Sequence, residues 1–234
     1  TESNIQSVRI NSIDFYLKNF IFSCLFTTFC MMILVNGTNF IDGLNGLVIS
    51  YFLIILYVIF RLNLIDLFFF DSLKLSLFII LLFTLLTLNF LNKLYLGDSG
   101  SYLIGILTGY FLISIYTNFP QISPYFVALL LWYPAFEILF SIIRKLALKK
   151  SPFKPDNNHF HHLLFFFIEK KFGLKKLTSN NFSSSVIILY NFIILNISAI
   201  NIYFTYFHII LIMMNVMIYL IIYMKLSDFK KLKV

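Results

Sequence analysis

Residues 16–35 read YLKNFIFSCLFTTFCMMILV, an apolar stretch with a single charged side chain. A helix of about 20 apolar residues is long enough to cross the roughly 30 Å of hydrocarbon in a bilayer. Comparable stretches follow at 46–60, 75–92, 101–117, 125–143, 184–202 and 207–224. The sequence therefore predicts an all-α, polytopic transmembrane helical bundle with about seven spans.

The composition agrees with this expectation. The 234 residues are 60% hydrophobic, with a mean hydropathy of +0.89, which is more apolar surface than a soluble core of this size can bury. We expect one integral membrane domain over 1–234. Its net charge of +8 fits topology and anionic headgroups, and no soluble basic domain supports nucleic-acid binding.

The basic residues indicate an orientation. Of the 18 Lys and Arg residues, 14 fall on one predicted side, and four fall on the other: Arg9, Lys18, Arg61 and Lys74. Lys and Arg accumulate in cytoplasmic loops. We therefore expect the N-terminus outside, the C-terminus in the cytoplasm, and residues 144–183 as a long cytoplasmic loop.

Polar residues in membrane segments are costly and usually functional, and here they form three clusters on one predicted face. The first is NGTNFIDGLNGL at 36–47, with Asn36, Asn39, Asp42, Gly43 and Asn45. Glycines weaken helices and carboxamides need partners. We predict a broken or re-entrant loop forming a polar pocket, with a plain Gly/Asn turn as the alternative.

The second cluster is LGDSGS at 96–101, before the fourth span. Asp98 could be only a helix N-cap. A helix N-terminus with Gly and Ser101 also offers N–H groups to phosphate, and an Asp beside phosphate suits Mg²⁺. Lys93 precedes this cluster and could neutralise phosphate, although basic residues are common at cytoplasmic helix ends.

The third cluster is SPFKPDNNHFHH at 151–162, which holds His159, His161 and His162. Their spacing does not place all three on one face of a regular helix, which argues against a three-His zinc site. Phosphate binding and proton transfer are the better uses, and a solvated loop is the alternative. We expect Glu137 to pair with Arg144, or else to face the site.

Together the three clusters resemble the polyprenyl-phosphate N-acetylhexosamine-1-phosphate transferase family. Its N-x-x-N-x-x-D-G-x-x-G-L motif matches 36–47, its G-D-x-G-S motif matches 97–101, and its H-x-H-H motif matches 159–162. The H-x-H-H form and the preceding SPFKPD stretch are similar to the branch that starts O-antigen, lipopolysaccharide-type or teichoic-acid chains. Within the family this favours a UDP-N-acetylated hexosamine over UDP-muramyl-pentapeptide.

The resemblance implies transfer of a sugar-1-phosphate from a UDP-N-acetylhexosamine to polyprenyl (undecaprenyl) phosphate, with release of UMP, on the cytoplasmic face of a bacterial inner membrane. It implies Mg²⁺, with Mn²⁺ as the alternative, held by Asn39 and Asp98. Asn45 would approach the uracil and the histidines would bind the pyrophosphate. The implied catalytic residues are Asp42, Asp98, His159, His161 and His162, and the implied substrate-binding residues are Asn36, Asn39, Gly43, Asn45, Lys93 and Ser101. A homodimer is left open.

One departure is the absence of the family's adjacent Asp pair. We expect the chain to be the C-terminal part of such an enzyme, lacking N-terminal helices, and to be inactive by itself. Two other readings stay open. One is a catalytically inactive relative that binds only nucleotide or partners, and the other is a transporter, which would need polar residues along a path to both faces.

Overall fold

The computed structural model describes residues 4–64, 72–151 and 157–233. Within them the secondary structure is helical. The helices are α1 (Asn11–Leu17), α2 (Phe20–Phe40), α3 (Leu47–Arg61), α4 (Ser72–Phe90), α5 (Gly97–Asn118), α6 (Pro124–Leu130), α7 (Trp132–Ala147), α8 (Phe160–Phe172), α9 (Lys176–Ser198) and α10 (Thr205–Lys233). The all-α prediction is confirmed.

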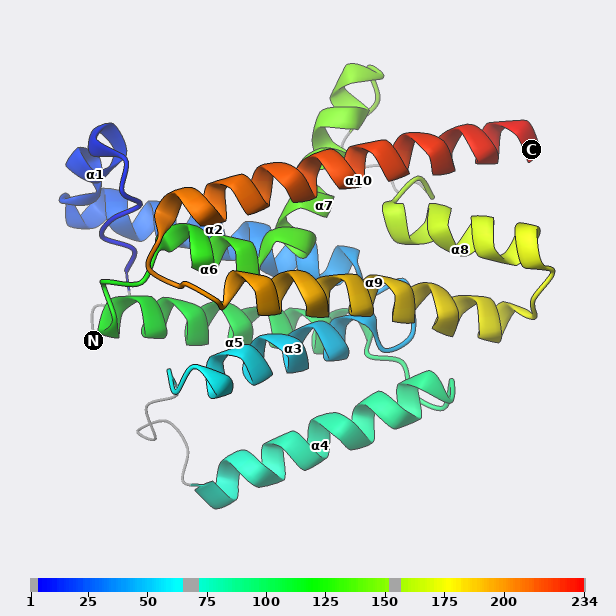
Figure 1. The fold of residues 1–234 in the computed structure, drawn as a ribbon, viewed down its shortest axis with the longest axis horizontal. Helices are drawn as coiled ribbons and strands as arrows, with labels where there is room; N and C mark the ends of the chain where they lie inside the picture. The colour runs from blue at the N-terminus through cyan, green and yellow to red at the C-terminus, as the bar shows by residue number, and fades with distance from the viewer. Residues whose placement is uncertain (1–3, 65–71, 152–156, 234) are drawn as a thin grey trace.

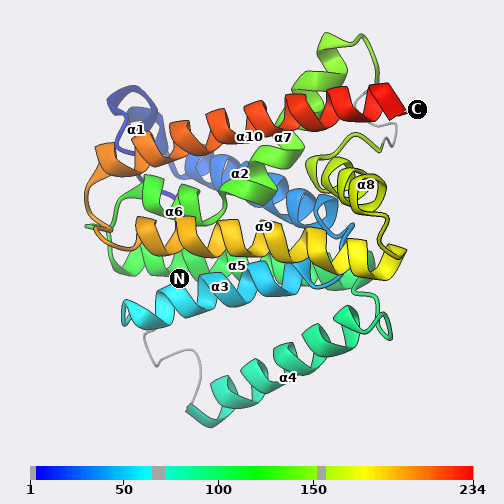
Figure 2. The same cartoon turned by 45° about the vertical axis from the view of Figure 1, so that its right-hand side comes forward.

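The long helices lie side by side and form a bundle (Figures 1 and 2). Helix α2 packs on α5 and α7, α3 packs on α9, and α10 packs on α6 and α8. Helix α4 lies at the edge of the bundle beside α3. One end of the bundle holds α1 and the α9–α10 connection, and the other holds α8, the end of α2 and the start of α5 (Figure 1).

Close helix crossings hold this bundle together. A β-carbon at Gly105 would lie 3.0 Å from the Cα of Val35, and one at Gly109 would overlap the side chain of Met31. Gly37 of α2 likewise lies against the backbone of Pro134. Small residues allow helix backbones to approach closely where apolar burial alone gives no drive to associate, so these glycines fix α2 against α5 and α7.

In the described part of the chain, four helices are long and apolar enough to cross a membrane, namely α2, α5, α9 and α10. The pair α6 and α7 is a candidate fifth span, bent by 77°. The predicted span 125–143 is therefore two helices. Pro134 lies in the first turn of α7, where a missing N–H is tolerated. Helix α3 and residues Ser76–Phe90 are shorter apolar helices, so seven spans and the orientation stay predictions.

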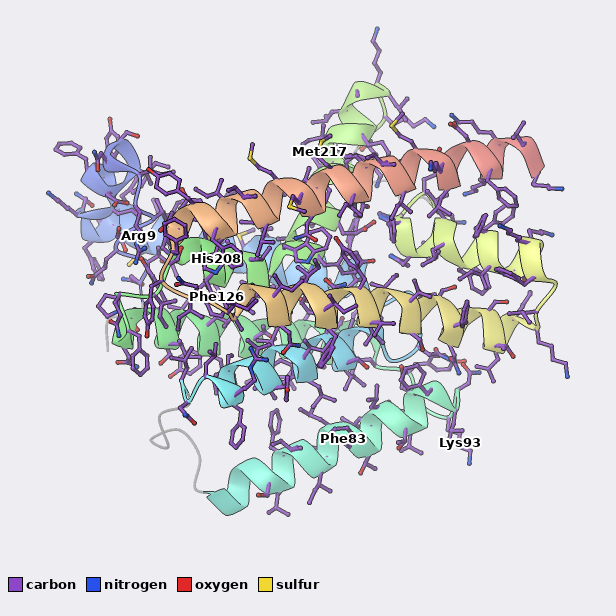
Figure 3. The ribbon with its side chains drawn as sticks, in the orientation of Figure 1. Arg9, Phe83, Lys93, Phe126, His208 and Met217 are labelled. Atoms are coloured by element: carbon purple, nitrogen blue, oxygen red, sulfur yellow. The ribbon has the colours of Figure 1, made fainter. Side chains whose placement is uncertain are left out.

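At the end opposite α8, Arg9 joins two connections. Its guanidinium donates to the carbonyl oxygens of Gln121 (2.7 Å) and Tyr203 (3.2 Å) and to Thr205 Oγ1 (2.7 Å). His208 lies nearby against Phe126, with ring centroids 5.4 Å apart (Figure 3). His208 is fully buried, and its Nε2 lies 3.1 Å from the Ser198 carbonyl oxygen. These contacts close the bundle away from the polar clusters.

Candidate active site

A pocket of about 1200 Å³ opens at the α8 end of the bundle. Its lining includes residues of all three polar clusters, although they are far apart in the sequence. The predicted site residues in its wall are Asn36, Asn39, Asp42, Gly43, Asn45, Asp98, His159, His161 and His162. The structure therefore brings together nine of the eleven predicted site residues.

The first cluster is more regular than predicted. Helix α2 continues through Asn36, Gly37 and Asn39 to Phe40, so the expectation of a broken loop over this part is wrong. The reason is that the carboxamides find partners. Asn36 Nδ2 donates to the Met32 carbonyl oxygen (2.7 Å), and Asn39 Nδ2 donates to Tyr102 Oη (2.9 Å). The chain turns only over 41–46, before α3.

The second cluster opens α5. Gly97 has φ of 65°, and Asp98 is the second residue of the helix. The N-cap residue is Leu96, so Asp98 does not cap the helix. Ser101 is fully buried and outside the pocket lining, and its Oγ donates to Asn39 Oδ1 (3.1 Å) or to the Asp98 carbonyl oxygen (3.0 Å). It links the two residues that the sequence predicts as metal ligands.

Two carboxyl groups meet at this junction. The pKa of Asp42 is raised from its ordinary value of 3.8 to about 7, first by burial and then by the neighbouring Asp98, while a hydrogen bond from the Gly97 N–H acts in the opposite sense. Desolvation and a like charge both disfavour the ionised form. Asp42 is therefore partly protonated near neutral pH, and a cation placed beside both carboxylates would favour its ionised form.

The donor set fits Mg²⁺. This ion is usually held through one or two carboxylates, with water and substrate phosphates completing its shell. Asp98, Asp42 and the Asn39 carboxamide supply such oxygen ligands. In the described segments no group of three or more His, Cys, Asp or Glu side chains is arranged to hold a metal ion.

The three histidines form a histidine wall of the pocket. His159 precedes α8 with an extended backbone, which brings all three rings together despite their spacing. The ring centroids of His159 and His161 are 5.7 Å apart and stacked, and those of His161 and His162 are 4.2 Å apart. Burial, followed by the neighbouring His162 and His159, lowers the pKa of His161 well below 6.5, so its imidazole is neutral at neutral pH.

His161 also points to a ligand. It is 0% exposed and lines the pocket, yet neither ring nitrogen has a hydrogen-bond partner among the described residues. Buried polar atoms are normally satisfied, so unsatisfied nitrogens facing a pocket are expected where a substrate supplies the missing bond. Gly43 lies directly against this ring, which joins the first and third clusters.

An asparagine network that we did not predict shapes the pocket. The Asn45 N–H donates to Asn180 Oδ1 (2.8 Å), and Asn45 Nδ2 lies within 3.4 Å of Asn92 Oδ1 and 3.3 Å of Asn181 Oδ1. Asn89 accepts from the Gly46 N–H and donates to the Leu94 carbonyl oxygen (2.6 Å). The signal for these residues was their position at the ends of apolar stretches.

The cations are placed differently from the prediction. Lys93 is exposed, lies outside the pocket lining and points away from the bundle (Figure 3). Lys145 of α7 is only 3% exposed and lines the pocket. Glu137 does not pair with Arg144. Its carboxylate instead contacts His159, Phe160 and Tyr219. Residues 152–156 of the SPFKPD stretch lie outside the described residues.

These features define a class of protein: a multi-pass membrane protein with a pocket of carboxylates, carboxamides and imidazoles at one end of its bundle. Residues 2–116, just under half of the chain, match the model of glycosyl transferase family 4. The match includes the first two clusters and ends before the histidines. The resemblance that the sequence motifs indicated is confirmed.

Curated relatives extend this finding. Over 69 residues, 30% of this chain and 22% of the relative, the chain is 39% identical to an undecaprenyl-phosphate alpha-N-acetylglucosaminyl 1-phosphate transferase of Thermotoga maritima. Over 160 residues, 59% of this chain, it is 29% and 30% identical to decaprenyl-phosphate N-acetylglucosaminephosphotransferases of Mycolicibacterium smegmatis and Mycobacterium leprae, covering 39% and 40% of them. The chain thus spans less than half the length of these relatives. No solved structure matches it significantly.

Proposed function

We propose that the full-length protein transfers N-acetylhexosamine-1-phosphate from a UDP-N-acetylhexosamine to polyprenyl phosphate. The names of the relatives support the lipid acceptor and the N-acetylglucosamine phosphate group. The observation that carries the proposal is that Asp42, Asp98 and the three histidines, far apart in the sequence, line one pocket.

In this reaction an oxygen of the lipid phosphate attacks the phosphorus that bears the sugar. The bond from that phosphorus to the bridging oxygen breaks, and UMP leaves with the bridging oxygen and its electron pair. Phosphoryl transfer depends mainly on placing two anionic groups in line and on neutralising charge. Mg²⁺ would neutralise charge on the diphosphate and would be held by Asn39 and Asp98, beside Asp42.

The remaining pocket residues have assignable tasks. A neutral His161 can donate one hydrogen bond to a diphosphate oxygen, and Asn36 and Asn45 offer carboxamides to the nucleotide or the sugar. The wall between α2 and α7 is apolar, with Phe29, Met32, Ile33, Ile138 and Ile142. This wall would accept the first isoprene units of the lipid, with Lys145 near its phosphate.

The polar residues also bear on the transporter alternative. Transport needs polar groups along a path to both membrane faces, whereas the three polar clusters line one pocket, at the α8 end of the bundle. We place this end at the cytoplasmic face of a bacterial inner membrane, where nucleotide sugars are made. The predicted excess of basic residues on that side supports the placement.

The test is a turnover assay with the full-length protein in detergent, given UDP-GlcNAc, undecaprenyl phosphate and Mg²⁺. We expect UMP and lipid-linked sugar in equal amounts. Asp98→Asn should abolish both without reducing membrane insertion, while the control Asp228→Asn, whose carboxylate is 67% exposed and paired only with Lys231, should keep the wild-type rate. Full activity of Asp98→Asn would refute the proposal. Nucleotide binding without turnover by the wild type would favour an inactive relative.

A further inference from the structure

Glu137 is a buried carboxylate that none of the proposed chemical steps uses. It lies in α7 and is 1% exposed. Its Oε2 accepts a hydrogen bond from Tyr219 Oη (2.8 Å), and its Oε1 accepts one from the Phe160 N–H (3.0 Å) and lies 3.4 Å from His159 Nδ1. Burying a carboxylate is costly unless such partners satisfy it, so this arrangement requires a specific fold around the side chain.

The contact with Phe160 satisfies the start of α8. The first N–H groups of a helix have no partner within the helix. His159 is the N-cap residue and its side chain makes no capping bond. The Glu137 carboxylate supplies the acceptor from another helix, and its negative charge suits the positive end of the α8 dipole. Helix α8 therefore begins where Glu137 holds it.

The contact with His159 extends this hold into the pocket. Besides Glu137, the His159 ring contacts two other pocket residues: it lies edge-on to Phe40 with centroids 4.8 Å apart and is stacked on His161. A displacement of His159 would thus be passed to His161, whose ring stacks on it with centroids 5.7 Å apart.

Helix α10 holds the same segment from the other side. Tyr219 binds Glu137, and one turn later Tyr223 Oη donates to the Asn158 carbonyl oxygen (3.0 Å). Lys230 Nζ donates to the Asn157 carbonyl oxygen (3.0 Å) and to Asn158 Oδ1 (2.8 Å). The residues just before the histidines are therefore tied to α10, and Glu137 is the point where α7, α8 and α10 meet.

We propose that Glu137 is a positioning residue for the transfer reaction, acting through His159 to set the orientation of the histidine wall. The proposal rests on the function proposed above. Glu137 would touch neither substrate. Replacing Glu137 should therefore lower kcat while leaving KM for the UDP-sugar nearly unchanged.

The first test compares Glu137→Gln with Glu169→Gln in the full-length protein. Gln keeps a carbonyl oxygen for the Phe160 N–H but removes the charge beside His159. Residues that orient a functional group typically change activity by roughly 10–100-fold when replaced. We expect a kcat loss of that size, partial recovery with Glu137→Asp, and no loss for Glu169→Gln, which removes the same charge near the far end of α8. A wild-type kcat for Glu137→Gln would overturn the proposal.

The second test separates positioning from general stability. If Glu137 acts through His159, adding Glu137→Gln to His159→Asn should cost little more than His159→Asn alone. Losses that multiply in the double variant would show an independent structural role and would overturn the proposal.

A third measurement does not depend on turnover. Diethyl pyrocarbonate acylates accessible imidazole nitrogens, and the Glu169→Gln variant serves as the reference. We expect Glu137→Gln to raise the modification rate of His159 at least roughly threefold relative to Glu169→Gln, because positioning groups restrict what they orient. An unchanged rate would overturn the positioning role. If the wild-type protein lacks turnover but Glu137→Gln still raises the modification rate of His159, only the proposed function is refuted.

Discussion

Gly43 and His161 touch across two motifs that are far apart in the sequence: a β-carbon added at Gly43 would lie 2.5 Å from His161 Nε2 and 3.1 Å from His162 Cε1. A side chain at position 43 would therefore clash with the His161 ring in its present orientation. The contact explains why the turn after α2 carries glycine, since the φ of Gly43 is not in the left-handed region.

We predict that Gly43→Ala moves the His161 ring and lowers kcat/KM for the UDP-sugar by roughly 10–100-fold, because small displacements in an active site can cost that much. The control is Gly173→Ala, which has φ of 63° and nothing within 4 Å of the added carbon. It should cost about 1 kcal/mol of stability and no activity. Wild-type turnover by Gly43→Ala would contradict the packing.

The raised pKa of Asp42 predicts a pH effect on stability without divalent cations. Between its ordinary value of 3.8 and its folded value of about 7, the folded protein holds a proton that the unfolded chain has lost. The contribution of Asp42 to the free energy of unfolding therefore falls as pH rises through this range. His161, with a pKa well below 6.5, acts in the opposite sense below pH 6.5.

Because the two effects overlap, the informative quantity is the difference in the free energy of unfolding between wild type and Asp42→Asn. Thermal unfolding in detergent with a chelator should show the variant gaining stability relative to wild type as pH rises from about 4 to about 7. Asp228→Asn should show no such trend. A difference that is flat with pH would mean that Asp42 titrates normally.

We predict that Asn89 stabilises the two turns beside the pocket that contain Gly46 and Leu94. It is 5% exposed and bonds the Gly46 N–H and the Leu94 carbonyl oxygen. Asn89→Ala leaves both backbone groups unsatisfied and should destabilise the protein by about 1–3 kcal/mol. Thr84→Ala, an exposed change in the same helix, should have little effect. Equal melting temperatures for the two variants would count against this role.

The lysines offer a contrast between sequence and structure. Lys145 is buried in the pocket lining and Lys93 is exposed outside it. A charged hydrogen bond is worth about 1.5–3 kcal/mol, so Lys145→Met should lower kcat/KM at least roughly tenfold, whereas Lys93→Met should lower it less than about twofold. A larger loss of kcat/KM for Lys93→Met than for Lys145→Met would contradict this assignment and would favour Lys93 as the cation beside the phosphate.

The helical class could be predicted from the sequence, and nine of the eleven predicted site residues line the pocket, for one physical reason. In an apolar chain, Asp42, Asp98 and the histidines are expensive, so their positions are informative. The sequence could not predict that Asn39 stays helical, because its carboxamide is satisfied by Tyr102, which lies far away in the sequence. The bend between α6 and α7 was signalled only by Pro134.

Residues whose role comes from tertiary partners were also missed. Glu137 has no motif around it, and its place two helical turns before Arg144 favoured a pair with that residue, with a side chain that faces the site as the alternative. Lys145 is one of several basic residues at the end of α7, and only the fold shows that it is the buried one. Pairing across elements is decided by packing, which spacing along one helix does not encode.

The central claim is that Asp98 and the histidine wall of this pocket bind the same diphosphate. The most direct measurement is an experimental structure of the full-length protein with UDP-GlcNAc and Mg²⁺. We predict the diphosphate between Asp98 and His161, with the metal against Asn39 and Asp98. A nucleotide bound elsewhere, or a diphosphate that contacts neither Asp98 nor the histidines, would contradict the account.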